Sequence, residues 1–263
     1  MSRSMATIAA DVPRLPLVRR LEAAGFRAWP AARVTFDGSW QLRITPGHPS
    51  KRLNSLVPLD PHDERDMEAR IRAAEAAFAA EGLNAAIRQS PLCPPALPDL
   101  LGRLGWHSGY ETLVMMADLD ELDLEGGMDH LPTHDIQRFA EACVRIDEAR
   151  DTTTATVASI ISAIEPAAGL FLMESADGPS AVGICVQDND LAGLQQVVVA
   201  KNLRGKGIGR ELASSALRWA RLRGARQAWL QVLVKNTNAR NLYDSMGFKD
   251  AYTYAYWQKG EWV

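Results

Sequence analysis

The chain has 263 residues, of which 47% are hydrophobic and 23% charged, close to the averages for globular proteins. Its length fits one large domain or two small ones, and its composition excludes a disordered or low-complexity chain. The net charge of −3 is shared by both parts of the chain, with 14 basic against 15 acidic residues in 1–122 and 15 against 17 in the rest. Because nucleic-acid binders usually carry a basic excess, we expect no nucleic-acid partner.

The sequence also indicates a compartment. No apolar run approaches the roughly 18–20 residues that a membrane helix requires, so we expect no membrane association. The opening stretch Met1–Ala10 is too short and too polar for the apolar core of a signal peptide. Cys93, Cys143 and Cys185 lie far apart and form no CxxC pair, which argues against disulfides and a metal site. We therefore expect a soluble cytoplasmic protein without a metal.

The front part of the chain reads as alternating strands and helices. Residues 65–81 are expected to be helical, because Met67, Ile71, Ala74 and Phe78 recur at i, i+4, i+7 and i+11. The expected elements are, in order, a strand-turn-strand over 35–44, a strand over 55–57, a helix over 65–81 that ends at Gly82, and a helix over 97–104 that ends at Gly105.

An acidic stretch, Asp118–Asp129, contains Gly126-Gly127 and is expected to join two units, 1–122 and 123–263. The unit beyond it has the same alternation. Its expected elements are a helical region over 134–164, strands over 169–175, 181–187 and 191–199, a helix from Ile208 to a stop at Gly224, a strand over 227–234, and a short helix from an Asn238 N-cap to Gly247.

The two units correspond to each other under one shift of 142 positions. The shift places Gly247-Phe248 on Gly105-Trp106 and the helix stop Gly224 on Gly82. One gapless shift that aligns both helices and both stops predicts two similar units in tandem, in an α/β fold with a mixed sheet. The alternative is that any two α/β segments share a similar order of strands, helices and glycine helix stops.

A glycine-rich turn follows the strand over 191–199. Glycines let backbone N–H groups approach a phosphate, and a helix N-terminus adds partial positive charge. The turn matches neither the dinucleotide-binding GxGxxG pattern nor a Walker loop. The candidate anion-binding residues are Arg204, Gly205, Lys206, Gly207, Ile208 and Gly209, with Lys201 and Arg210 beside them.

Residues 194–248 resemble the GNAT acyltransferase superfamily. Arg204, Gly207 and Gly209 correspond to its R/Q-x-x-G-x-G/A pyrophosphate loop. Its second block is matched without gaps by Asn236, Ala239, Leu242, Tyr243, Gly247 and Phe248. The strand residues Val197, Val198 and Val199 occupy the place where family members pair their backbone with the pantetheine arm.

The resemblance implies acetyl-CoA as cofactor and direct transfer of its acetyl group to a primary amine of a small molecule or peptide. Tyr243 corresponds to the general acid that protonates the leaving thiolate, and Asn236 would hold the pantetheine through its amide. Each has a structural alternative, a tyrosine packed in the core and an asparagine that caps a loop.

The general base is not assigned. Many family members place Glu or Asp on the strand before the loop, where this chain has Gln195 and Gln196, which cannot take a proton. Asp188, Asp190 and Glu174 lie nearby in sequence, and the choice among them stays open, as does a chain of water molecules.

The front unit lacks the residues that carry the resemblance. The shift places His62, Arg65 and Met67 on Arg204, Gly207 and Gly209; Leu101 replaces Tyr243, and Pro94 replaces Asn236. We therefore expect a degenerate copy without a cofactor site, packed on the active unit within one chain. A monomer with pseudo-twofold halves and a homodimer both remain open.

The acceptor groove is expected to be shaped by residues 134–164, the start of the 191–199 strand and the strand over 252–258, with the front unit as one wall. Tyr252, Tyr254 and Tyr256 share one face of that last strand, in sheet packing or, as the lesser alternative, in lining the acceptor site. Beside an N-acetyltransferase, two other functions stay open: an acyl-CoA-binding module without catalysis, and a structural protein.

Overall fold

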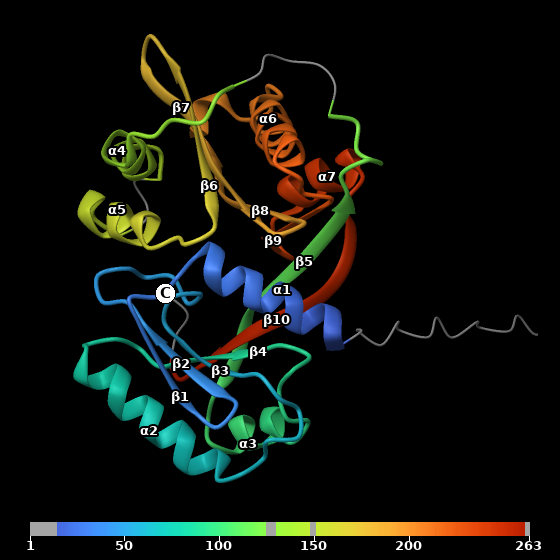
Figure 1. The fold of residues 1–263 in the computed structure, drawn as a ribbon. Coiled ribbons are helices and arrows are strands. Elements are labelled where there is room, and N and C mark those ends of the chain that lie inside the picture. Colours follow the sequence, from blue (N-terminus) through green and yellow to red (C-terminus); the bar gives the residue numbers. More distant parts are fainter. Residues whose placement is uncertain (1–14, 125–129, 148–150, 261–263) are drawn as a thin grey trace, which may run out of the picture.

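The computed structural model describes residues 15–124, 130–147 and 151–260 (Figure 1). The opening stretch Met1–Ala10 and Gly126-Gly127 of the expected join lie outside these ranges. The first half consists of α1 (Leu15–Ala28), β1 (Arg33–Asp37), β2 (Trp40–Ile44), β3 (Ser55–Pro58), α2 (Met67–Ala80), β4 (Ala86–Gln89), α3 (Leu97–Arg103) and β5 (His107–Asp118).

The second half begins with two helices, α4 (Ile136–Ile146) and α5 (Thr154–Ser162). It continues with β6 (Ala167–Ser175), β7 (Gly178–Asp188), β8 (Leu191–Val199), a short 3-10 helix η1 (Lys201–Leu203), α6 (Ile208–Leu222), β9 (Gln227–Leu233), α7 (Thr237–Met246) and β10 (Lys249–Gln258). Each half thus contains three strands, a helix, a strand, a helix and a strand, in the same order.

All described strands belong to one mixed sheet of ten, in the order β1-β2-β3-β4-β10-β5-β9-β8-β7-β6. β10, the last strand of the second half, lies between β4 and β5 and pairs antiparallel with both. β5, the last strand of the first half, lies between β10 and β9. Each half therefore places its final strand inside the sheet of the other (Figure 1). The halves pack against each other within one chain, as expected, and the predicted mixed α/β sheet is confirmed.

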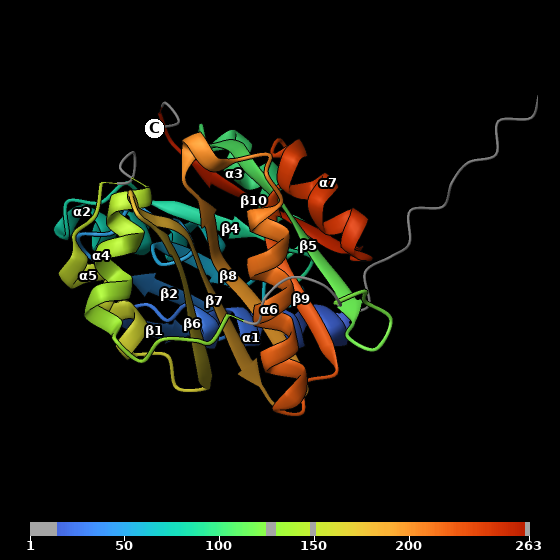
Figure 2. The ribbon, with the colours of Figure 1, turned by 90° about the horizontal axis from the view of Figure 1, so that it is seen from above.

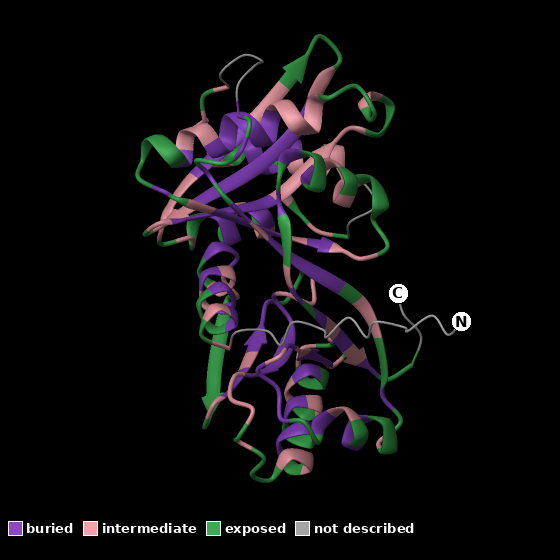
Figure 3. Ribbon diagram, turned by 90° about the vertical axis from the view of Figure 1, so that its right-hand side faces the viewer, coloured by how far each residue is buried: buried purple, intermediate pink, exposed green. Residues whose placement is uncertain are grey.

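The helices cover the sheet on both faces, because each presents an apolar side to it. In the second half, α6 and α7 lie on one face and α4 and α5 on the other, with α1 crossing between the halves (Figures 1 and 2). The buried residues gather along the strands and on the inward sides of the helices (Figure 3). Three apolar clusters result, one beneath α6 and α7, one beneath α1, α4 and α5, and one in the first half beneath α2 and α3.

One local prediction was incomplete, and one was wrong. The helical region 134–164 is two helices, because Asp147 caps the end of α4 and the Thr153 side chain begins α5 by accepting a hydrogen bond from the N–H of Thr156. The short helix α7 is capped by Asn236 and not by Asn238. The side chain of Asn236 accepts from the N–H of Ala239, which satisfies one of the unpaired donors of the first turn.

A buried ion pair of the first half lies beneath α1 and also contacts the last strand of the second half. The guanidinium of Arg88 on β4 donates to both carboxylate oxygens of Glu22 on α1, at 2.6 and 2.9 Å, and both side chains are almost wholly buried. From β10, Tyr252 donates to Glu22 at 2.7 Å, and the Tyr256 hydroxyl accepts from Arg88 at 3.1 Å. The last strand of the chain is thus tied to the first half by polar contacts as well as by the sheet.

We expect Glu22→Gln to lower the free energy of unfolding by about 3–5 kcal/mol, because it leaves the buried guanidinium of Arg88 without a compensating charge. Urea unfolding would measure the change. The control is Glu68→Gln, which removes an exposed carboxylate from a surface pair with Arg72 and should change stability by about 0.5 kcal/mol or less. Equal small effects of both variants would contradict a dominant role for the buried pair.

Candidate active site

Two neighbouring parallel strands separate in the second half. β8 and β9 pair from Leu191 with Gln227 to Leu194 with Leu230 and not beyond. A cavity of about 220 Å³ lies between their separated ends. Its lining consists of Arg52, Leu194, Gln195, Gln196, Val197, Val198, Leu230, Gln231, Val232, Leu233, Asn236, Ala239 and Tyr243. Strand backbone that has lost its partner offers N–H and C=O groups to an extended ligand.

A β-bulge in β8 accompanies this separation. The register with β7 shifts between the pairs Val182–Val198 and Ile184–Gln195, and Gln196 has a φ of 51°. A bulge bends its strand and redirects the backbone groups beside it. The sequence carries no signal for it, since glutamine is not a residue that favours positive φ.

The glycine-rich turn follows β8 and opens helix α6. Gly205 and Gly207 have φ values of 77° and 83°, and Gly207 is the N-cap residue of α6. A Cβ built on either glycine would meet nothing within 4 Å, so the turn requires glycine for its backbone conformation and leaves open space above it. Arg204 donates to the carbonyl of Val199 at 3.1 Å and so fixes the turn to the end of β8.

This turn suits a diphosphate. The first N–H groups of α6 have no partner within the helix, and its N-terminus carries partial positive charge. Lys201 and Lys206 are exposed there. Arg210 donates to the carbonyl of Ser245 at 2.9 Å, which links α6 to α7. The predicted residues of the loop therefore lie together directly after β8, whose residues Val197 and Val198 line the cavity and whose last residue is Val199.

Tyr243 lies on α7 and lines the same cavity. Its side chain is 7% exposed, and its ring packs edge-on against Phe248, with centroids 5.7 Å apart. Burial raises the pKa of its phenol to about 12, so the group is neutral and keeps its proton at physiological pH. Tyr243 is therefore packed in the core and also lines the cavity, so a packing role and a role in the site are compatible. Asn236 lines the cavity while its side-chain oxygen caps α7.

A second, larger cavity of about 570 Å³ adjoins the first and shares Arg52, Gln231 and Leu233 with it. The first half supplies part of its wall, as expected, through residues 49–52 and through Tyr110 on β5. Tyr254 and Tyr256 also line it, and Tyr254 donates to Gln231 at 2.8 Å. The whole lining is Pro49, Ser50, Lys51, Arg52, Tyr110, Thr112, Asp147, Asp151, Gln231, Leu233, Tyr254 and Tyr256.

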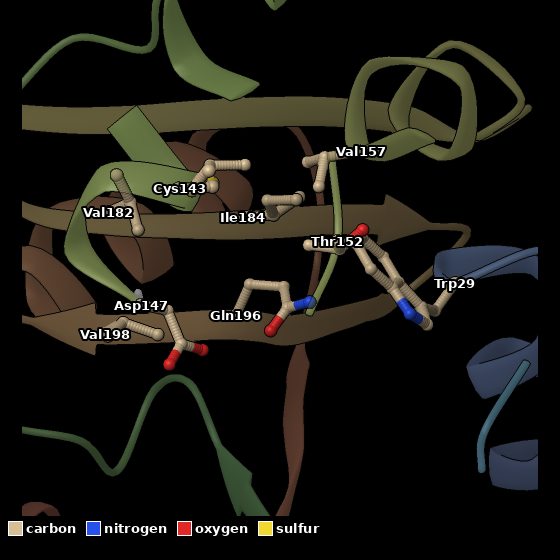
Figure 4. A pocket seen from close by; sticks show the side chains of 10 residues that line it. Trp29, Cys143, Asp147, Thr152, Val157, Val182, Ile184, Gln196 and Val198 are labelled. Atoms are coloured by element: carbon tan, nitrogen blue, oxygen red, sulfur yellow. The ribbon is translucent and has the colours of Figure 1, made fainter. Parts of the chain in front are cut away.

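A third, smaller pocket lies between β7, β8 and the helices α4 and α5 (Figure 4). Figure 4 shows Asp147 and Gln196 on its β8 side and Trp29, from the first half, at its end. Asp147 lines both this pocket and the larger cavity. The end of α4 therefore brings a carboxylate to the side of β8 that carries the bulge.

None of the three carboxylates that the sequence left open as bases lines these cavities. Asp188 accepts from Arg27 at 2.7 Å, and Asp190 is paired with Arg20, whose hydrogen bond lowers the pKa of that carboxyl. Glu174 is paired with Arg138. Instead, the larger cavity is lined by Asp147 and Asp151, which the sequence analysis missed. The break between α4 and α5 could have pointed to them, but the sequence pattern was interpreted only as a helical region over 134–164.

The corresponding turn of the first half is built differently. Asp66, with a φ of 46°, is the N-cap residue of α2 in the position that Gly207 has before α6. Arginines meet carboxylates there, Arg65 with Asp37 at 3.0 Å and Arg70 with Asp63 at 3.0 Å. Leu101 is wholly buried. Whether this half has lost cofactor binding stays a prediction.

Over the ranges that the structure describes, no helix has both the length and the apolar character to cross a bilayer. In the same residues no group of three or more His, Cys, Asp or Glu side chains is placed to hold a metal ion.

Comparison with known proteins bears on this site. A family model described as "Probable histone acetyltransferase Rv0428c C-terminal" matches residues 17–257. The chain is 27% identical over 243 residues to "Uncharacterized N-acetyltransferase YobR" of Bacillus subtilis (strain 168). The match covers 88% of this chain and 94% of that protein.

Solved structures share the fold. A GCN5-related N-acetyltransferase from Kribbella flavida superposes with a TM-score of 0.70 at 17% identity, over 96% of this chain and 98% of its own. A tandem GNAT protein from the clavulanic acid biosynthesis pathway superposes with a TM-score of 0.58 at 12% identity, over 92% of this chain and 89% of its own.

Proposed function

Because the chain belongs to the family described as probable histone acetyltransferase Rv0428c C-terminal, a GNAT-type family of N-acetyltransferases, it is an acyltransferase, and we propose that it uses acetyl-CoA. In this proposal it moves the acetyl group directly to a primary amine of a small molecule or peptide. Residues 123–263 are the catalytic unit, and residues 1–122 are a copy without a cofactor site.

The residues present fit acetyl-CoA. The open, positive-φ backbone at Gly205 and Gly207 and the free N–H groups of α6 suit the diphosphate. The backbone of Val197–Val199 faces the separated side of β8, where a pantetheine arm could pair with it, and Asn236 stands at the opposite wall. When bound, the cofactor supplies an acetyl group activated as a thioester.

The chain's own residues then divide the proton transfers between two cavities. Tyr243, neutral and buried, holds a proton at its phenol oxygen beside the first cavity and can donate it to a leaving thiolate. The acceptor enters through the larger cavity, where Asp147 and Asp151 are the carboxylates able to take a proton from its ammonium group, directly or through water. Arg52, Gln231 and Leu233 line the passage between the cavities.

The observation that carries this proposal is the continuity of three features: a glycine turn at a helix N-terminus, a cavity between separated parallel strands, and a second cavity that adjoins it. Titration calorimetry with acetyl-CoA should give one site per chain, and thiol release should depend on an added amine. Two equivalent sites per chain would contradict the assignment of the first half.

The alternative, an acyl-CoA-binding module without catalysis, predicts a different pair of results. It would bind acetyl-CoA as well, but it would release no thiol with any member of an amine panel. The proposal as a whole fails if acetyl-CoA does not bind at millimolar concentration.

A further inference from the structure

The loop over residues 46–54 of the first half is held in place by buried polar side chains. Arg43 donates to the carbonyl of Arg52 at 3.1 Å, and Asn54 donates to the carbonyl of His48 at 2.7 Å. The N–H of Ser50 donates to the imidazole of His48 at 3.1 Å. Arg43, His48 and Asn54 are each no more than 5% exposed. Burying three polar side chains is costly unless they are hydrogen-bonded, so this network fixes one loop conformation.

The fixed loop presents two cations to the active unit. Lys51 lies over the ring of Tyr110, 5.0 Å from its centroid, and lines the larger cavity. Arg52 lines both cavities and donates to the side-chain oxygen of Gln195 on β8 at 2.6 Å. Burial lowers the pKa of Lys51, and an anion placed beside it would stabilise its charged form.

The opposite side of the same cavity is acidic. Asp147 and Asp151 line it from the second half, and Thr152, next in the chain, donates to the carbonyl of Gly47 in the fixed loop at 3.4 Å. Two cations and two carboxylates thus line the cavity from different halves. A ligand that carries one positive and one negative group matches this distribution, whereas a polyamine has no negative group for the cationic side and a phosphate dianion is repelled by the carboxylates.

We propose that the acceptor is an amine that also bears a carboxylate, an amino acid or a short peptide with a free C-terminus, and that Lys51 and Arg52 bind that carboxylate. This rests on the proposed acetyltransferase function. Arginine binds carboxylates through paired N–H donors, and Arg52 stands where the cavities meet. A carboxylate held there keeps a nearby amine at the entrance to the first cavity. The first half, in this proposal, selects the acceptor.

The test compares matched acceptors with saturating acetyl-CoA. Amino acids and dipeptides are assayed against their own carboxamides, which keep the amine and lose the negative charge. We expect kcat/KM for the free acids to exceed that for the carboxamides by about ten- to a hundredfold, the range of a charge-assisted hydrogen bond. Diamines such as putrescine and phosphorylated amines such as phosphoethanolamine complete the panel.

The variant that isolates the loop is Lys51→Met, with Lys235→Met as its matched control. Lys235 also lies over the Tyr110 ring, 5.2 Å from its centroid, but it is exposed and is not among the residues lining the cavity. Lys51→Met should raise KM for free acids about tenfold with little change for the carboxamides, and Lys235→Met should leave both unchanged. Thermal melting confirms that both variants fold.

Three outcomes overturn the proposal while leaving the acetyltransferase function intact: equal turnover of acids and carboxamides, preference for diamines or phosphorylated amines, or an equal effect of the two lysine variants on all acceptors. Binding of acetyl-CoA with no turnover of any carboxylate-bearing amine also overturns it. Failure of acetyl-CoA to bind defeats the underlying function instead.

Discussion

Gly207→Glu is expected to abolish acetyl-CoA binding. The φ of 83° at this position strains any residue with a side chain by roughly 1–2 kcal/mol. The glutamate would also extend into the open space above the turn and place a negative charge at the proposed site of the diphosphate. Titration calorimetry should show no heat at acetyl-CoA concentrations a hundred times the dissociation constant of the unchanged protein.

The control is Gly82→Glu. Gly82 ends α2 in the first half with a φ of 66°, and a Cβ built on it likewise meets nothing within 4 Å. This variant has a similar backbone strain and the same added charge, away from the proposed site, so it should bind acetyl-CoA normally. Retained binding in Gly207→Glu, or equal loss in both variants, would show that the turn before α6 does not hold the diphosphate.

Tyr243→Phe is expected to lower turnover by about 10²–10⁴-fold, the usual contribution of one positioned general acid. The change removes one oxygen and keeps the ring that packs on Phe248, so folding and acetyl-CoA affinity should be nearly unchanged. The measurement is kcat for the best acceptor in both proteins, beside the dissociation constant of acetyl-CoA.

This prediction has a clear contrary result. If the phenylalanine variant keeps near-full kcat while the chemical step limits the rate, the thiolate leaves without a proton from Tyr243. If affinity and stability fall together with kcat, the tyrosine acts through packing. Because the side chain is buried, affinity and stability have to be measured beside kcat.

Local signals in the sequence sufficed for most elements of the fold. Gly82, Gly105, Gly224 and Gly247 all have positive φ, and each follows a helix where the sequence predicted its end. These signals act over a few residues, because a helix end needs only a residue that can adopt the left-handed region. The exchange of β5 and β10 could not be predicted in this way. Each of these strands could fill either of two similar positions in the sheet. Contacts between residues far apart in sequence decide which position it takes.

The positions of the candidate site residues were predictable to a similar extent. The residues from Arg204 to Gly209 lie together because they form one turn, and Tyr243 follows from its place on a short helix. The wall of the larger cavity was predicted only in outline, since Lys51 and Asp147 come from different halves. Their juxtaposition depends on how the halves pack, which neither periodicity nor spacing reveals.

The exchanged strands have a consequence for how the protein is made. A ribosome completes β5 before any residue of β9 or β10 exists, so the first half leaves the exit tunnel with no strand between β4 and β5. At a synthesis rate of about 5–20 residues per second, the strand that fills this gap arrives roughly 7–28 s later. Unpaired strand edges favour association with other chains during that interval. Native folding of the nascent chain therefore has to wait for β10, and the two halves form together once that strand has been made.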